Sequence, residues 1–176
     1  MQKQDPAISY ILQENILNEK TMQMVLKQQQ ASGKNLINIL EENKLVDEDQ
    51  LTRIIAATNK IKFINLSPDM VQPMAAHMVS SEIVNQHNVI PVKKEGDNLL
   101  VAMSEPWNLV VRDQIGIKTG CKIVPVAATP TAIRQAVRYH FNVRNITRQA
   151  IASMRLKQDT EKKKQQYIGH KDKSAL

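Results

Sequence analysis

Apolar residues recur at helical spacing through the first third of the chain, and the same pattern occurs twice. Residues 11–19 align with residues 39–48 when Lys44 is treated as a one-residue insertion. Each copy predicts a short helix, a turn at Asn15 or Asn43, an N-cap at Asn18 or Asp47, and a second helix with apolar residues at i, i+3 and i+4. Gly33 is expected to end the second helix of the first copy. Neither copy can bury its apolar stripe alone, so the two are predicted to pack together as a small helical bundle.

The pattern changes to a mixture of strands and helices after residue 59. Strands are predicted at residues 62–66, 89–95, 98–103 and 122–126, and the second and third form a hairpin around Gly96 and Asp97. Pro125 places the last strand at an edge or a bulge. Four helices are predicted. The first begins at Pro73 and includes Met74, Ala75 and Met78, and the second runs from Ser80 or Ser81 to about Asn88. The third opens at Pro106 to Asn108 and closes near Gly120, and the fourth begins at Thr129 and Pro130 with one apolar face formed by Ile133, Ala136, Val137, His140 and Phe141.

This order predicts an α+β fold in which the helical bundle of two tandem helix-turn-helix repeats packs beside a compact α/β subdomain with a small mixed sheet. The expected domains are the helical repeats at residues 1–59, the α/β subdomain at 60–143 and a basic extension at 144–176. In the extension, Ile146, Ala150, Ile151 and Met154 can continue a helix. The polar residues after Leu156 are expected to form a mobile linker or tail.

Charge and composition narrow the classes of protein that the chain can represent. The net charge is +7, but residues 144–176 hold nine of the 24 Lys and Arg and only three of the 17 acids. Aromatic residues make up 3% of the chain, too few for a nucleic-acid site built on stacking. Nucleic-acid binding is therefore not expected, and binding through the basic tail is the last-ranked hypothesis. No apolar run approaches the ~20 residues of a membrane span, and the single Cys121 fits a reducing, cytoplasmic compartment.

The sequence offers no catalytic constellation. The segment from Gly116 to Gly120 contains Lys118 and Thr119 as a phosphate-binding loop does, but Ile117 stands where that loop needs a glycine. The histidines at 77, 87, 140 and 170 have no ligand partner at metal-binding spacing, and the first three are expected to be half-buried helix residues. We therefore predict no enzyme, no catalytic residue, no metal and no cofactor.

Residues 59–141 resemble the N-terminal domain of the ATPases that drive type II secretion and type IV pilus assembly, the GspE/PilB/MshE group. The segments that carry the resemblance are residues 62–66, 89–92, 96–108 and 119–126, followed by the helix with Ala132, Ile133 and Ala136. The tandem repeat at residues 7–57 is similar to the repeat that precedes this part in the same family.

The resemblance implies a role in docking rather than in catalysis. In this family the N-terminal domain attaches the ATPase to a cytoplasmic domain of an inner-membrane platform protein, so the chain is expected to be cytoplasmic and peripheral to the inner membrane through its partners. The ATPase core is a further expected partner. No core follows here before Leu176, which leaves two alternatives: an N-terminal piece of a longer ATPase, or a stand-alone adaptor. Candidate docking residues are Trp107, Met70, Met74 and Met78, for which an ordinary place in the core is the alternative.

Some members of the family bind cyclic di-GMP through the repeats, each of which supplies an Arg-Leu-Gly start and a later glycine. In this chain Asn35, Leu36 and Ile37 stand at the start of the second repeat, and Lys44 replaces the later glycine. In the first repeat the corresponding residues are Pro6, Ala7 and Ile8, with Asn15 at the later position. Lys34 and Asn35 are the remaining candidates for contact with a nucleotide. A cyclic di-GMP sensor is therefore the alternative function, less favoured than docking.

Overall fold

The computed structural model describes the backbone of residues 5–171 and the side chains of residues 5–142, 147–148 and 150–164. The chain divides into two compact units between Val137 and Arg138. The first unit contains the helical repeats and the sheet, and the second contains the last residues of one helix and the whole of a second, long helix. The predicted domain boundaries after residues 59 and 143 stay a prediction.

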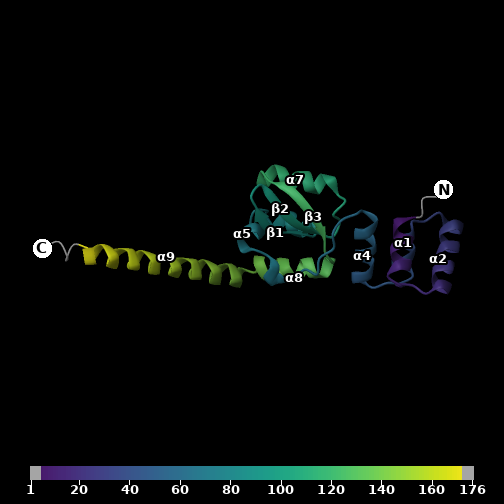
Figure 1. The fold of residues 1–176 in the computed structure, drawn as a ribbon, viewed down its shortest axis with the longest axis horizontal. Coiled ribbons are helices and arrows are strands. Elements are labelled where there is room, and N and C mark those ends of the chain that lie inside the picture. Colours follow the sequence, from purple (N-terminus) through teal and green to yellow (C-terminus); the bar gives the residue numbers. More distant parts are fainter. Residues whose placement is uncertain (1–4, 172–176) are drawn as a thin grey trace. The chain divides into compact units, whose positions relative to one another are not determined.

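Four helices form the N-terminal part of the first unit (Figure 1). They are α1 (Pro6–Gln13), α2 (Glu19–Ser32), α3 (Leu36–Glu42) and α4 (Glu48–Thr58). The predicted N-caps are confirmed: the Asn18 side chain accepts the N–H of Thr21 at 2.8 Å, and Asp47 forms a reciprocal capping box with Gln50. Gly33 ends α2 with φ 65°, as predicted.

The turn between the two helices of each repeat has the same geometry in both copies. The backbone is left-handed at Asn15 and at Lys44, with φ 51° in each. The N–H that follows this residue bonds back to the carbonyl of Ile11 in the first repeat and of Leu40 in the second, at 3.0 Å in both. The copies are thus related by a constant 29 positions. The predicted insertion at Lys44 was wrong, because Lys44, and not Asn43, occupies the position of Asn15.

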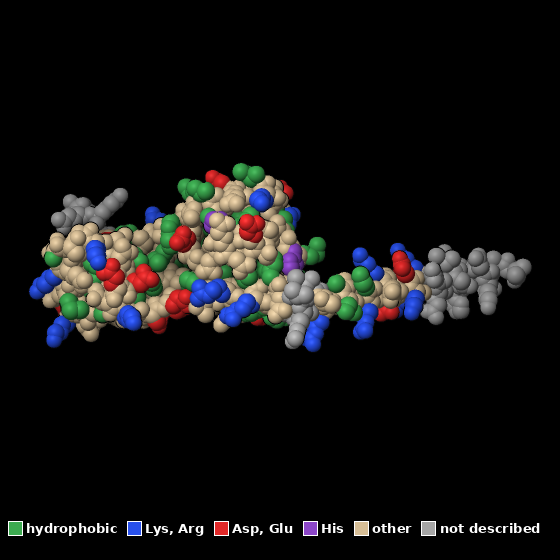
Figure 2. Space-filling model, turned by 180° about the vertical axis from the view of Figure 1, so that it is seen from behind, with side chains coloured by type: hydrophobic (Ala, Val, Ile, Leu, Met, Phe, Trp, Pro, Cys, Tyr) green, Lys and Arg blue, Asp and Glu red, His purple; other side chains and the backbone are tan. Residues whose placement is uncertain are grey.

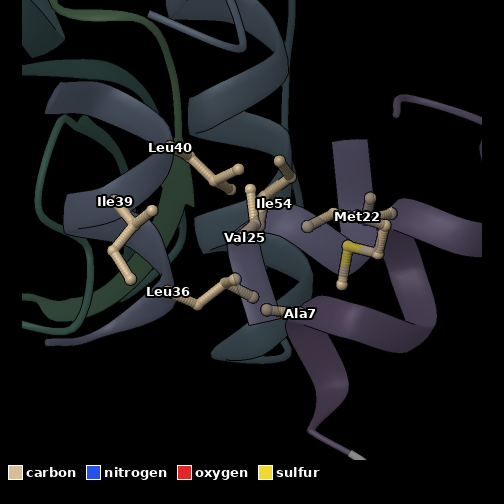
Figure 3. Close-up of a cluster of buried hydrophobic side chains, with 8 residues drawn as sticks. Ala7, Met22, Val25, Leu36, Ile39, Leu40 and Ile54 are labelled. Atoms are coloured by element: carbon tan, nitrogen blue, oxygen red, sulfur yellow. The ribbon is translucent and has the colours of Figure 1, made fainter. Parts of the chain in front are cut away.

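The register decides which side chains are buried in the bundle. With the constant offset Ile11 corresponds to Leu40, and both are fully buried, whereas Leu12 is 46% exposed. Ile11 and Leu40 belong to one apolar cluster to which all four helices contribute (Figure 3). Its buried members are Ala7, Ile11, Met22, Val25, Leu36, Ile39, Leu40 and Ile54. The predicted bundle is confirmed, because each repeat buries its stripe against the other.

The α/β part is built on a three-stranded mixed sheet, as predicted. Its strands β1 (Val89–Glu95), β2 (Asn98–Met103) and β3 (Lys122–Ala127) lie in the order β1-β2-β3, with β1 antiparallel and β3 parallel to β2. Helix α7 covers one face of the sheet and the start of α8 the other (Figure 1). The remaining helical elements are η1 (Pro68–Met70), α5 (Pro73–Ala76), α6 (Ser81–His87), α7 (Leu109–Thr119) and α8 (Pro130–Phe141).

Two predicted elements are shorter than the sequence suggests. Residues 62–66 form a single bridge from Phe63 to Ala127 instead of a strand. The reason is that β3 ends at Ala127, so the segment has only one residue of that strand to pair with before Pro68 turns it away. Helix α5 ends at Ala76, which leaves Met78 outside it.

Strand β3 is an edge strand, as Pro125 predicts. The N–H and C=O of Ala127 both point away from β2, because they bond residues 62 and 64 at 2.8 and 2.9 Å. The backbone N–H and C=O groups of successive strand residues point to opposite sides of the strand. The backbone groups of Pro125 and Ile123 therefore point away from β2, as those of Ala127 do. A proline is tolerated at this position because the N–H that it lacks would face away from the sheet.

Polar and cation–π contacts join α4 to the α/β part. The Arg53 guanidinium carbon lies 4.1 Å from the centre of the Phe63 ring, and the Arg53 side chain donates to Asn65 Oδ1 at 3.2 Å. Glu48 Oε1 accepts the N–H and the hydroxyl of Thr131 at 3.2 and 3.1 Å. These contacts lie within the one compact unit that includes both the helical repeats and the sheet.

The second unit contains α9 (Val143–Lys171). Ile151 and Met154 lie in this helix, as predicted, but the helix continues past Leu156, where a mobile segment was expected. Residues 151–164 contain four Lys and neither Gly nor Pro, a composition that favours helix even without a packed face. The mobility of this part stays a prediction. All side chains from 151 to 164 are exposed.

Candidate functional site

A pocket of about 370 Å³ brings together two residues that the sequence singles out for different reasons, Asn35 and Trp107. Asn35 is the N-cap of α3, and its Oδ1 accepts the N–H of Ile37 at 3.0 Å. Trp107 precedes the N-cap of α7, Asn108, and is 40% exposed. The pocket therefore lies where the second helical repeat meets the α/β part.

The polar side chains of this pocket are held in place by local hydrogen bonds. Asp5 Oδ1 accepts the N–H of Ala7 at 2.9 Å as the N-cap of α1. Thr58 Oγ1 donates to the carbonyl of Ile54 at 2.8 Å, and Asn59 Nδ2 donates to the carbonyl of Ile55 at 2.9 Å. The pocket thus combines fixed hydroxyl and amide groups with one indole ring, an arrangement suited to a planar ligand with hydrogen-bonding edges.

The charge of the pocket is less suited to a phosphate. Asp5 is the only charged residue that lines it within the described part of the chain. Lys34, the other predicted nucleotide contact, is not among the lining residues; its Nζ pairs with Glu42 at 2.7 Å. The structure therefore brings Asn35, but not Lys34, to the pocket.

The other predicted docking residues lie on the surface around α5. Met74 is 87% exposed and Met70 46%, while Met78 is half-buried. An ordinary core role is thus wrong for Met70, Met74 and Trp107. Their part in docking stays a prediction.

A second hollow, of about 510 Å³, lies between α7 and β3 and was missed in the sequence. Its lining includes Arg112, Ile117 and Ile123. The signal that could have revealed it is the helical periodicity of α7: Val111 and Ile115 form the buried stripe, so apolar Val110 and Ile117 fall on the outer face. We call this hollow the α7–β3 groove.

The histidines are dispersed, and the described residues contain no group of His, Cys, Asp or Glu able to hold a metal. His77 is exposed, where partial burial was predicted, because it follows the last residue of the short α5. His87 is half-buried, as predicted, and His140 is almost fully buried. His170 lies outside the described side chains.

The hydropathy of the helices also bears on the surroundings of the protein. None of the helices that the structure describes is long and apolar enough to cross a membrane.

Comparison with known proteins shows which family and which relatives the chain resembles. Residues 59–145 match the family model described as the MshEN domain. The type IV pilus assembly ATPase PilB of Myxococcus xanthus (strain DK1622) is 28% identical over 131 residues, which make up 74% of this chain and 23% of that protein. PilB of Pseudomonas aeruginosa is 29% identical over 110 residues, 62% of this chain and 19% of that protein.

Two solved structures share the fold. A structure of MshE with cdg matches with a TM-score of 0.60 and 20% identity, covering 78% of this chain and 99% of the other. The N-terminal domain of XpsE matches with a TM-score of 0.53 and 17% identity, covering 78% and 97%.

These findings define the class first: the chain shares its fold with MshE and with the N-terminal domain of XpsE. Residues 59–145 belong to the MshEN domain family, and the chain is homologous to the N-terminal region of the type IV pilus assembly ATPases. It spans less than a quarter of the length of these two curated relatives.

Proposed function

We propose that the chain is a non-catalytic docking module of a type IV pilus or type II secretion ATPase, or a stand-alone homologue, that binds a cytoplasmic protein of the inner-membrane platform. The observation that carries the proposal is the MshEN match, which covers the whole sheet together with α5 to α8. In this function the chain works in the cytoplasm and is held near the inner membrane by its partner. The ATPase core is a second partner to which the chain can bind.

The surface of the α/β part supports a docking role. Monomeric proteins rarely expose several large apolar side chains together without a binding function. The space-filling view shows hydrophobic side chains along the top of the α/β part, where Figure 1 places α7 (Figure 2). Exposed apolar residues of this part include Met70, Met74, Trp107, Leu109, Val110 and Ile117.

The proposal is tested by binding to purified platform proteins. The chain is immobilised and titrated with the cytoplasmic domain of each inner-membrane platform protein encoded in the same genome, and with the ATPase core. Saturable binding to one platform domain, with no ATP hydrolysis by the chain alone, is the expected result. Absence of binding to every platform domain contradicts the docking function, and hydrolysis above that of a buffer control contradicts the non-catalytic one.

The second candidate function is the binding of cyclic di-GMP. It is favoured by the likeness to MshE with cdg and by the pocket in which Trp107 faces the second repeat. Positive φ at Asn15 and Lys44 also means that the turns keep the backbone shape that the family's glycines would give.

The electrostatics of the pocket weigh against this candidate. A cyclic dinucleotide carries two phosphates, and phosphate recognition favours a bidentate Arg or a Lys, neither of which lines the pocket among the residues that the structure describes. Calorimetric titration with cyclic di-GMP at moderate salt is expected to give no heat, and no thermal stabilisation is expected at high excess. Micromolar binding that Trp107→Ala abolishes would instead establish the sensor function.

A further inference from the structure

Helix α7 exposes apolar residues that its packing on the sheet does not use. Val111 and Ile115 are buried, whereas Val110 and Ile117 are 76% and 84% exposed. Ile117 lines the α7–β3 groove together with the half-buried Ile123. The groove exists because Gly116 lets α7 lie close to the start of β3; a Cβ at this position would lie 3.3 Å from the carbonyl oxygen of Cys121.

Arg112 gives the groove a specific chemical requirement. This residue lines the groove and is half-buried, and its Nε atom is buried with no hydrogen-bond acceptor among the described residues. A buried donor without an acceptor is costly, more so on a charged group. A guanidinium pairs best with a carboxylate, which can accept two of its N–H groups at once. No acid among the described residues accepts from Arg112 Nε, and the half-buried guanidinium is left to pair with a carboxylate from outside the chain.

The charges around the groove indicate the sign of its occupant. Among the described residues, Arg112 and Lys122 line it with one acid, Asp113, and Lys118 follows on the same helix. A second copy of the chain would bring the same positive excess against itself in a two-fold contact. A partner with an acidic group therefore fits better than a second copy.

The free backbone edge of β3 cannot pair with a full additional strand from a partner. Only Ile123 offers both an outward N–H and an outward C=O, because Ala127 already pairs with residues 62–64 and Pro125 has no N–H. A ladder between two strands needs donors at alternate residues. Recognition in the groove must rest on side chains.

We propose that the α7–β3 groove is the docking site of the partner protein, and that the docked segment places a carboxylate on Arg112 and an apolar side chain on Ile117 and Ile123. This inference rests on the proposed function and names the surface that performs it. The occupant is an acidic and apolar segment of a protein.

The test measures the affinity of the chain for the platform domain that it binds, using full-length variants. Arg112→Gln removes the charge but keeps a polar amide. Ile117→Glu replaces an apolar side chain by an acid at a position that is too exposed to affect folding. We expect binding to weaken ~30-fold or more for Arg112→Gln and ~10-fold or more for Ile117→Glu, as for buried charge pairs and central apolar contacts. Met24→Glu, on exposed α2 surface, is the matched control and should change affinity less than ~2-fold.

The outcomes separate the inference from the function on which it rests. If the unmodified chain binds no platform domain, the docking function fails and the inference with it. If it binds and both groove variants bind equally well, only the inference fails, and loss with Met74→Glu would move the site to the α5 surface.

Light scattering is expected to show a monomer; a dimer that Arg112→Gln dissociates would make a second copy the occupant and overturn the proposal. Recovery of binding when Arg112→Glu meets a partner whose acid is changed to Lys would identify the pair.

Discussion

Replacing Leu40 by Ala tests the register of the helical repeats, because the constant 29-residue offset makes Leu40 the counterpart of Ile11 and leaves Leu12 outside the core. Leu40 is fully buried in the cluster drawn from all four helices. The substitution removes three carbons, worth about 2.4 kcal/mol in transfer free energy at about 0.8 kcal/mol each. The cavity that remains raises the expected loss of unfolding free energy to about 3 kcal/mol.

The matched substitutions are Ile11→Ala and Leu12→Ala. Ile11→Ala should cost about as much as Leu40→Ala, since it also removes three carbons from a fully buried side chain. Leu12 is 46% exposed, so Leu12→Ala should cost about 1 kcal/mol, roughly half of the transfer free energy of three buried carbons. For a chain of this length 1 kcal/mol corresponds to about 2–4 °C in Tm, so the buried variants should melt about 6–12 °C lower.

The assay is urea unfolding followed by the fluorescence of the single tryptophan, Trp107. This residue lines the pocket with residues of α3 and α4, so its emission reports on the part of the chain that is perturbed. If Leu12→Ala were as destabilising as Leu40→Ala and Ile11→Ala were neutral, the 29-residue register would be refuted.

Three further predictions follow from local geometry. Lys44→Gly should raise the free energy of unfolding by up to about 1 kcal/mol, because Lys44 has φ 51°, which glycine adopts without strain; an unchanged urea midpoint would contradict this. Asp47→Ala should cost about 1 kcal/mol by removing the capping box of α4, with Asp47→Asn, which loses the charge but keeps a side-chain acceptor, as the comparison for lost charge. The Ser67 side-chain hydrogen bond lowers the pKa of Asp69, so its stabilisation is present above the usual carboxyl pKa and lost as pH falls through the lowered one; Ser67→Ala should raise the Asp69 pKa in an NMR titration, and an unshifted titration would refute the cause.

The sequence predicts those features of the fold that rest on local chemistry. Asn18 and Asp47 are recognisable as N-caps because a side-chain acceptor precedes an apolar stripe. Gly33 and Gly120 end their helices in the left-handed conformation. Pro125 indicates an edge strand because it removes a donor that only an edge can spare.

Features that depend on contacts between distant residues could not be predicted in this way. Residues 62–66 have the composition of a strand, but the end of β3 at Ala127 limits them to one bridge. The repeat register was misjudged because Asn15 and Asn43 are identical in type, whereas the left-handed residue of the second turn is Lys44.

The same limit applies to the candidate sites. Asn35 and Trp107 were singled out separately, and only the packing of α3 and α4 near the start of α7 places them in one pocket. Arg112 carries no motif; its interest comes from burial of Nε without an acceptor among the described residues, which is a property of three-dimensional structure.

The central claim is that this chain binds a protein of the inner-membrane platform and does so without a nucleotide. The most direct measurement is calorimetric titration of the full chain with the cytoplasmic domain of each platform protein, with and without cyclic di-GMP. The account predicts saturable one-to-one binding to one domain, with an affinity that cyclic di-GMP leaves unchanged. Heat from cyclic di-GMP alone, together with none from any platform domain, would contradict it.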